Sequence, residues 1–200
     1  GPETAPVTEI TAIAHRKDAM FYSILAGKNP EHNTLGSIAT FAIQRALAGA
    51  LRKELPAIRD INVYLDPRFG SMAHIVMSIT KKNDTEPMAL MEAAFKAAGG
   101  FFPVSHITKR IVVVDDDVNV HNTSDVLFRL CANTDPQRDS IFTKGPSDVL
   151  DHATSEIASG SKLGIDATKK LPGEGFKRPW PPLIKMDAAV KAKAENLFNP

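Results

Sequence analysis

One short run of β-branched residues constrains the fold of this chain more than any other feature. Ile111–Val114 is apolar at every position, with two basic residues before it and three aspartates after it. A strand without a polar face is buried on both sides, which is typical of a parallel strand covered by helices. The run therefore predicts an interior strand of an α/β protein.

The rest of the chain carries alternating strand and helix signals. Apolar alternation predicts strands at residues 7–15, 20–25, 61–65, 73–80, 109–114 and 140–143. Apolar stripes at helical spacing predict helices at residues 35–55, 88–98, 123–132 and 187–198. Thr34 and Thr123 are expected to cap two of these helices, and Pro56 to end the first. Because hairpins and crossovers are both present, we expect an α/β sandwich, a mixed sheet flanked by helices, with a long irregular C-terminal tail that ends in a helix.

The periodicity fades after Lys144, where glycine and proline accumulate. We expect residues 1–150 to form the α/β domain, and residues 151–200 to be a loop, tail and helix of the same domain. Trp180 lies among prolines in this tail, which has no composition for a core of its own. It is expected to dock on its own domain or on a partner, and docking within a larger assembly is preferred. The opening residues, Gly1–Pro6, are typical of a cut linker or a cloning scar, so a fragment is expected.

Composition argues against several classes of function. The chain has 24 Lys and Arg against 23 Asp and Glu, and a net charge of +1 creates no strong field for nucleic acid or an anionic membrane. No apolar stretch reaches the ~18 residues that a membrane span needs, and no signal-peptide pattern is seen. Cys131, the single cysteine, lies in an apolar run that predicts a core position. The absence of a disulfide framework fits a reducing, cytoplasmic setting.

Three aspartates, Asp115–Asp117, follow the interior strand, at the end where α/β proteins place ligands. Asp115 and Asp117 would share a face if extended, and carboxylates are ligands for Mg²⁺. The preferred interpretation is that the acids end the strand and that Asp117, Asn119 or Thr123 caps the next helix. None of the six histidines has the spacing of a zinc site, so no metal-ligating residue is predicted.

A glycine- and lysine-containing segment, Gly160–Lys170, is the second candidate site. Glycines allow a backbone to approach an anion closely, and Lys162 would add a point charge for a phosphate. The Walker order of glycines and lysine is absent. The spacing alone leaves two interpretations open: a phosphate site, or an exposed basic loop.

Four segments also carry a resemblance to a known family. They are Ile10–Met20, Ile111–Val120, Asp125–Leu130 with Asp135–Asp139, and Gly160–Lys170, of which the last is the most specific. In order and spacing they resemble the C-terminal half of the UbiD-family decarboxylases, over nearly the whole chain. What this family is known to do is therefore an expectation for this chain.

The resemblance implies a reaction that needs more than this chain. Members of the family reversibly decarboxylate aromatic and α,β-unsaturated acids with prenylated FMN, which acts as an electron sink. The family's Glu-Arg-Glu catalytic set and the metal ligands for the flavin phosphate lie upstream of the strand expected from Val7, and Glu3 and Glu9 do not match them. We therefore expect no catalytic residue here and no activity of the isolated chain. Prenylated FMN, with Mn or Mg and K, belongs to the complete enzyme and is not expected to be held by this chain alone.

Peripheral site residues are also implied by the resemblance. Lys162 matches the lysine that contacts the flavin phosphate, so residues 151–200 include a cofactor-edge loop. Leu35 matches a position that walls the substrate pocket, and Leu25–Gly27 matches a loop near the isoalloxazine. Ala26 stands where better-known members have Cys or Thr, so no role is assigned to it.

The expected partners follow from the same resemblance. They are the remaining N-terminal portion or a partner subunit of the decarboxylase, and further copies of this chain in a homodimer or a higher homo-oligomer. The alternative is a stand-alone, non-catalytic subunit or interaction domain of a multi-subunit decarboxylase or carboxylase.

Overall fold

The computed structural model describes residues 7–23, 30–64, 73–97, 104–182 and 184–198, apart from the side chains of residues 30–33 and 35–40. Its strands are β1 (Ile58–Tyr64), β2 (Ala73–Ile79), β3 (Thr108–Asp115), β4 (Ser140–Pro146) and β5 (Ser159–Asp166). Its helices are α1 (Pro30–Glu54), α2 (Glu86–Lys96), α3 (Val104–Ile107), α4 (Thr123–Asn133) and α5 (Ala188–Phe198). In this part of the chain, no helix is both long and apolar enough to cross a membrane.

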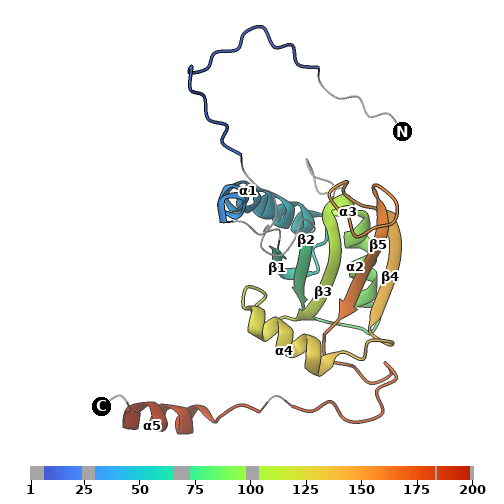
Figure 1. Ribbon diagram of the computed structural model, residues 1–200. Helices are drawn as coiled ribbons and strands as arrows, with labels where there is room; N and C mark the ends of the chain where they lie inside the picture. The colour runs from blue at the N-terminus through green and yellow to red at the C-terminus, as the bar shows by residue number, and fades with distance from the viewer. Residues whose placement is uncertain (1–6, 24–29, 65–72, 98–103, 183, 199–200) are drawn as a thin grey trace.

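The five strands form one mixed sheet in the order β1-β2-β3-β5-β4 (Figure 1). β2, β3 and β5 are parallel, while β1 and β4 pair antiparallel at the two edges. β3 is the central strand, and Ile111–Val114 are each at most 1% exposed. The prediction of a mixed sheet with an interior strand buried on both faces is therefore confirmed.

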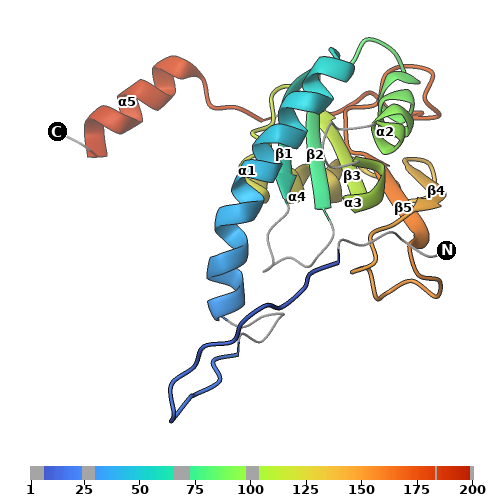
Figure 2. The same ribbon diagram turned by 90° about the horizontal axis from the view of Figure 1, so that it is seen from above.

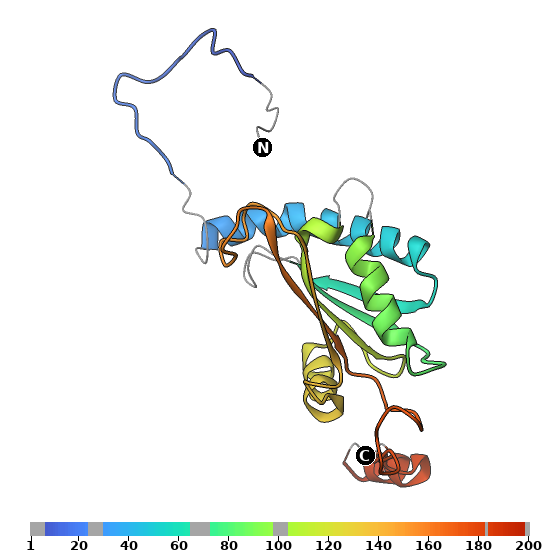
Figure 3. The ribbon, with the colours of Figure 1, turned by 90° about the vertical axis from the view of Figure 1, so that its right-hand side faces the viewer.

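Helices cover the two faces unequally. α1, α2 and α3 lie on one face, where Leu47, Leu51, Met91 and Phe95 pack against the sheet in the larger core (Figures 2 and 3). α4 lies on the other face, where a smaller core gathers around the valines of β3. Alternation along each strand sends successive side chains to opposite cores, so the face of a residue follows from its position.

The caps of the helices differ from the sequence prediction. α1 begins at Pro30, so Thr34 lies inside the helix and is not its N-cap, while Pro56 follows its end as predicted. α4 is capped by Asn122, whose side chain accepts a hydrogen bond from the Ser124 amide at 3.0 Å. The predicted caps Asp117, Asn119 and Thr123 are wrong, because Asn122 also has the accepting side chain and stands in the extended conformation that an N-cap needs.

The predicted N-terminal strands are not formed in this structure. Residues 7–15 have no regular secondary structure and are exposed throughout, and residues 20–23 are the same. The rest of the second predicted strand, residues 24–25, lies outside the described residues. Alternation by itself makes no strand, because a strand needs a neighbour for its backbone hydrogen bonds.

Two further differences concern α4 and β5. Cys131 is exposed rather than in the core, because it lies four residues after the half-exposed Leu127 on the outer face of α4. The strand β5 was not predicted, because glycine and lysine dilute its apolar pattern. It nevertheless inserts between β3 and β4, and it carries the second candidate site.

The C-terminal tail returns to the domain before it leaves again. The Phe176 and Trp180 rings lie 4.9 Å apart, and the Arg138 guanidinium lies 5.9 Å from the Phe176 ring centroid. Trp180 thus lies against its own domain, which is the less favoured of the two docking predictions. The predicted last helix exists as α5, and it has no buried residue (Figure 1).

Candidate functional site

The segment Gly160–Lys170 is β5 and the turn that follows it, not an exposed loop. Along β5 the side chains alternate, and Lys162 and Asp166 point to the face that carries α2, whereas Leu163 and Ile165 point to the other face. Lys162 is only 4% exposed and Asp166 only 2%. The interpretation of this segment as an exposed basic loop is therefore wrong.

Gly164 has a packing role in this strand. A Cβ added there would lie 2.8 Å from Ile141 Cγ1 on β4 and 2.8 Å from Met91 Sδ on α2. The missing side chain lets α2 approach the sheet closely. The sequence interpretation, in which the glycines let the backbone approach an anion, gives no account of this contact.

Lys162 is a buried cation without a carboxylate partner among the described residues. Its Nζ donates a hydrogen bond to the Thr108 carbonyl oxygen at 2.7 Å, and among the described residues no acid comes within salt-bridge distance of it. Burial lowers the pKa of Lys162, and the neighbouring charge of Lys109 lowers it further, against an opposing effect of Asp151. An ammonium group has three donors, so two N–H groups remain for another acceptor.

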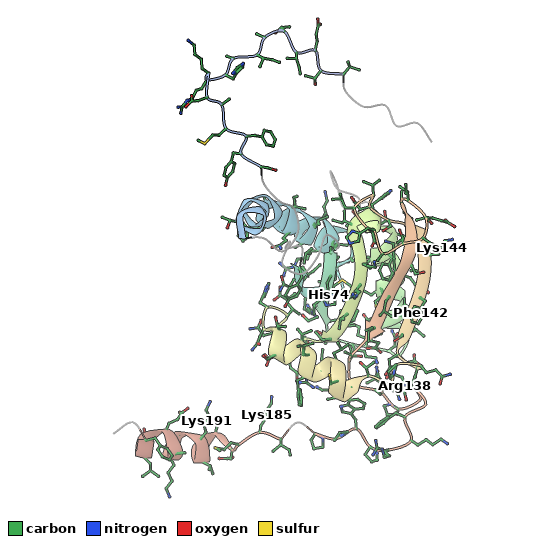
Figure 4. All side chains as sticks on the ribbon, in the orientation of Figure 1. His74, Arg138, Phe142, Lys144, Lys185 and Lys191 are labelled. Atoms are coloured by element: carbon green, nitrogen blue, oxygen red, sulfur yellow. The ribbon has the colours of Figure 1, made fainter. Side chains whose placement is uncertain are left out.

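A cavity of about 410 Å³ adjoins this lysine, between α2 and the β4–β5 pair. Lys96 and Lys144 line it together with Lys162, and among the described residues Glu92 is the single acid in its lining. Figure 4 shows Lys144 on β4 at the edge of the sheet. The Thr108 hydroxyl is also buried without a hydrogen-bond partner in the described part of the chain. Lys144 is also paired with Glu156 at 3.7 Å, so the buried ammonium of Lys162 is the main feature of this cavity that is suited to an anion.

Asp151, beside this site, forms an ion pair with Lys109. Lys109 Nζ lies 2.7 Å and 2.9 Å from the two carboxylate oxygens of Asp151, and Ser147 Oγ donates to the same group at 3.0 Å. Burial raises the pKa of Asp151, but these bonds outweigh it and hold the pKa below its usual range. This carboxylate is thus paired with Lys109, and within the described ranges Lys162 has no carboxylate at salt-bridge distance.

The other end of β5 holds a buried network of charges in which every member is paired. Lys170 Nζ lies 2.9 Å from Asp166 Oδ2 and 3.2 Å from Asp139 Oδ1, while Lys81 contacts Asp166 and Glu174. These five side chains are all at most 9% exposed. The turn is closed by Asp166, which accepts hydrogen bonds from the Thr168 amide and hydroxyl at 2.9 Å and 2.6 Å.

Asp139 is the most heavily bonded acid of this network. Arg138 donates to it at 2.8 Å and 2.7 Å, and the Asp135 amide donates at 2.7 Å. Burial raises the pKa of Asp139, but the bonds from Arg138 and Asp135 and the charge of Lys170 outweigh burial and lower the pKa. Sequence reasoning missed this network, although the acid and the two lysines of Asp166–Lys170 directly follow a strand.

Each aspartate of the triplet is hydrogen-bonded or ion-paired to a neighbouring residue. Asp115 Oδ2 accepts the Lys169 amide at 2.9 Å, Asp116 accepts the Thr80 hydroxyl at 2.5 Å, and Asp117 pairs with Arg129 at 3.0 Å. Burial is the main reason that the pKa of Asp115 is raised. Within the described ranges no group of three His, Cys, Asp or Glu side chains is placed to hold a metal ion. The acids brace the turn after β3.

Most of the remaining predicted site residues have side chains outside the described part of the chain. Leu35 lies in α1, but its side chain is outside the described residues, as is the whole of Leu25–Gly27 with Ala26. His74 on β2 has a buried Nδ1 without a hydrogen-bond partner in the described chain, and burial lowers its pKa to about 4 (Figure 4).

A second cavity, of about 680 Å³, lies between α4 and the tail. Its lining includes Arg129, Arg138, Lys169 and the Trp180 ring. These three cations are already paired with Asp117 or Asp139, at distances between 2.7 Å and 3.7 Å, and Arg178, also in the lining, stacks 5.5 Å from the Phe176 ring centroid. Lys162 is the cation that is buried without a carboxylate partner in the described part of the chain, so the cavity beside it is the better candidate for an anion.

Known proteins match both the sequence and the fold. The family described as 3-octaprenyl-4-hydroxybenzoate carboxy-lyase C-terminal domain matches residues 37–167. An uncharacterised protein of Archaeoglobus fulgidus is 37% identical over 99% of this chain, and one of Aquifex aeolicus is 34% identical over 97%. The chain spans 39% and 38% of the length of these two relatives.

Two solved structures share the fold. The vanillic acid decarboxylase of Sedimentibacter hydroxybenzoicus superposes with a TM-score of 0.64 over 77% of this chain and 31% of that chain, at 20% identity. The UbiD-class enzyme HmfF from Pelotomaculum thermopropionicum, solved with FMN, has a TM-score of 0.54 over 80% of this chain and 34% of that chain, at 30% identity. With more than half of the chain inside the family match, the protein belongs to the UbiD family and contains its C-terminal domain.

Proposed function

We propose that this chain supplies the cofactor-phosphate edge of a UbiD-type carboxy-lyase. The complete enzyme would reversibly decarboxylate aromatic or α,β-unsaturated carboxylic acids with prenylated FMN. Family membership supports the reaction class, and the FMN complex of HmfF supports a flavin. The observation that carries the proposal is Lys162, a buried ammonium without a carboxylate partner in the described part of the chain, at the wall of a cavity that Lys96 and Lys144 also line.

The residues present fit a flavin phosphate. Lys162 has two unused N–H donors, and a hydrogen bond to a charged acceptor contributes about 1.5–3 kcal/mol. The exposed Lys96 and Lys144 add positive charge around the same cavity. An arriving phosphate would repay the desolvation of Lys162, because opposite charge favours the ammonium form.

The chemistry of the reaction would lie outside this chain. When bound, prenylated FMN supplies an electron sink for loss of CO₂. This chain would hold and orient the phosphate end through Lys162, while the Glu-Arg-Glu set and the metal ligands would come from the remainder of the enzyme. Manganese or magnesium and potassium would belong with that remainder, since the aspartates after β3 are bonded to Lys169, Thr80 and Arg129.

An activity assay tests this division of labour. The purified chain of 200 residues, supplied with prenylated FMN, is expected to release no CO₂ from any aryl or acrylic acid. The complete enzyme reconstituted in the same buffer is the positive control. Turnover by the chain alone would show that it contains the catalytic groups, and would contradict the proposal that it supplies only the cofactor-phosphate edge.

We propose further that the chain associates with a second copy through α5. Val190 and Leu197, 56% and 73% exposed, are seven residues apart and so lie on one side of the helix, and Met186, 63% exposed, lies two residues before it. A contiguous exposed apolar surface usually marks an interface, and a two-fold dimer is the commonest closed arrangement. The same exposed apolar residues also support the alternative in which this chain is a non-catalytic interaction domain.

Sedimentation across a tenfold dilution range tests the dimer. Association is expected for the parent chain and for Ala192→Asp on the other side of α5. Val190→Asp combined with Leu197→Asp should give a species of one chain, 21.7 kDa. A single-chain mass for the parent at every concentration would rule out self-association through α5.

A further inference from the structure

The cavity between α4 and the C-terminal tail has a stiff wall on the tail side, where the chain runs beneath α4 (Figure 1). Among the described residues of this wall, three are prolines whose rings fix the backbone φ: Pro179, Pro181 and Pro182. The turn that leads into this segment uses Gly173 and Gly175, which have φ of +106° and +73°. The wall is therefore largely formed before a ligand arrives, which lowers the entropy cost of binding.

Both walls of this cavity carry aromatic rings. On the tail, the Phe176 and Trp180 rings lie 4.9 Å apart, and their planes are 52° apart. On α4, Phe128 lines the cavity and is 60% exposed. Aromatic pairs prefer centroids about 4.5–7 Å apart, either offset-stacked or edge-to-face, so these rings leave a surface on which a further ring can pack. The lining is therefore suited to a planar aromatic group.

Of the four described cations in the lining, Arg178 is the one that is left for an anion. The other three are each paired with an aspartate. Arg178 instead lies over the Phe176 ring, 5.5 Å from its centroid, and no carboxylate pairs with it in the described part of the chain. Its guanidinium is a planar fork of N–H donors that matches the two oxygens of a carboxylate. One available guanidinium indicates a ligand with a single negative charge.

A buried hydroxyl in the same lining also lacks a partner. Thr134 is the C-cap of α4, and its Oγ1 is buried without a hydrogen-bond partner among the described residues. A buried polar atom that stays unpaired destabilises the fold unless a ligand or an ordered water bonds to it. Because Thr134 lines the cavity, a polar group of a ligand can satisfy this hydroxyl. The lining thus offers a polar contact in addition to Arg178.

We propose that this cavity binds a planar aromatic carboxylate, with its ring against Phe128 and Trp180 and its carboxylate on Arg178. The volume of about 680 Å³ lies within the range of about 300–1,000 Å³ that is typical of ligand pockets. A small inorganic anion would use Arg178 but would leave the rings uncovered. The described lining shares no residue with that of the cavity beside Lys162, so this site does not rest on the proposed flavin site.

The fluorescence of Trp180 tests this site directly, because Trp180 is the single tryptophan of the chain. Benzoate is titrated into the purified chain, and a saturable change of the tryptophan emission is expected. Cyclohexanecarboxylate has the same charge and nearly the same size but no aromatic ring, and it should bind about 3- to 10-fold more weakly. Benzamide keeps the ring and loses the charge, and it should bind at least about 10-fold more weakly.

Three variants assign the carboxylate contact. Arg178→Gln removes the guanidinium and should weaken benzoate binding at least about 10-fold. Lys177→Gln, at the neighbouring exposed residue outside the lining, is the matched control for loss of one positive charge and should bind benzoate as the parent does. Lys162→Met should also bind benzoate as the parent does, so this proposal and the proposed flavin site fail separately.

Four outcomes would overturn the proposal. The first two are the absence of a saturable change in the parent, and equal benzoate affinity of Arg178→Gln and the parent. The third is equal affinity for benzoate and cyclohexanecarboxylate, which would show that the rings select nothing. The fourth is loss of benzoate affinity in Lys162→Met, which would place the anion in the other cavity.

Discussion

The two ends of β5 bury lysines in opposite ways. At the carboxyl end, Lys170 meets Asp139 and Asp166, and Lys81 meets Asp166 and Glu174. Near the amino end, Lys162 is equally buried, yet it bonds only to a backbone carbonyl in the described part of the chain. Burial is the same at both ends, so it is the pairing that separates a structural lysine from one that is available to a ligand.

The energies of the two sites differ for the same reason. Bringing an ion out of water costs several kcal/mol, and this is recovered only through good partners. In the paired network, the ion pairs offset this cost. Removing one partner would leave an uncompensated charge in the interior. At Lys162, one hydrogen bond offsets little of the desolvation cost. Burial of this lysine therefore destabilises the free chain, and an anion would stabilise it. Mutations should therefore act more strongly on the paired site, and pH should act on the two sites in different ranges.

The largest effect is expected at the paired end. Lys170→Met leaves Asp139 and Asp166 buried without their shared cation, and breaking a buried pair costs about 3–5 kcal/mol. Urea unfolding at pH 7 measures the loss. Lys82→Met, at an exposed lysine, is the control and should stay within about 0.5 kcal/mol of the parent. A loss below about 1 kcal/mol for Lys170→Met would contradict the structural role of the network.

A smaller effect is expected between the two ends, at Gly164. The Cβ in Gly164→Ala would meet Ile141 and Met91 at 2.8 Å, and overpacking of this kind costs about 1–3 kcal/mol. Gly49→Ala is the matched control, because nothing lies within 4 Å of its added Cβ. Because Gly49 lies in the interior of α1, Gly49→Ala should raise the free energy of unfolding by about 0.5–1 kcal/mol. Equal effects of the two substitutions would contradict the packing role of Gly164.

The pH dependence of stability should also differ between the two ends. The pKa of Asp139 is lowered in the fold, so its contribution is complete above the unfolded pKa of about 3.9 and is lost as the pH falls through the folded pKa. Asp139→Asn should thus be destabilised at pH 7, with a difference that shrinks below about pH 4. The exposed Asp84→Asn is the control, and its urea midpoint should follow the parent at every pH. A constant difference down to pH 2 would contradict this assignment.

The smallest effect on stability is expected at Lys162. Lys162→Met loses one hydrogen bond but also the cost of a buried charge, so a change of about 0–1 kcal/mol is expected. Because the pKa of Lys162 is lowered in the fold, the parent should gain stability as the pH rises from the folded pKa to about 10.4. The variant should lack this gain in urea unfolding between pH 7 and 10. A loss comparable to that of Lys170→Met would make Lys162 structural.

The sequence predicts the framework of this protein well, since local patterns determine it. The apolar run Ile111–Val114 locates the central strand, and the apolar stripe before Pro56 locates α1. The resemblance of Gly160–Lys170 to a family signature is matched by the family assignment. In each case the signal lies within a few consecutive residues.

What sequence reasoning missed depends on contacts between distant residues. β5 was hidden because Lys162 and Asp166 face the interior, where an apolar pattern is expected, and their burial depends on Thr108 and Lys170. Cys131 was assigned to the core from its neighbours along the chain, although the face of α4 determines its exposure. The N-terminal strand was predicted from alternation alone, whereas a strand also needs a neighbour for its backbone hydrogen bonds, and residues 7–15 have none in the described part of the chain.

Flavin retention by Lys162→Met in the complete enzyme tests the central claim most directly. Enzyme purified with prenylated FMN is assayed for flavin per protein, with Lys82→Met as the control for loss of a positive charge. Losing a charge-assisted bond of about 1.5–3 kcal/mol weakens binding roughly 10- to 150-fold, so Lys162→Met should retain far less flavin than the parent or the control. Equal flavin content in all three proteins would show that Lys162 does not hold the phosphate.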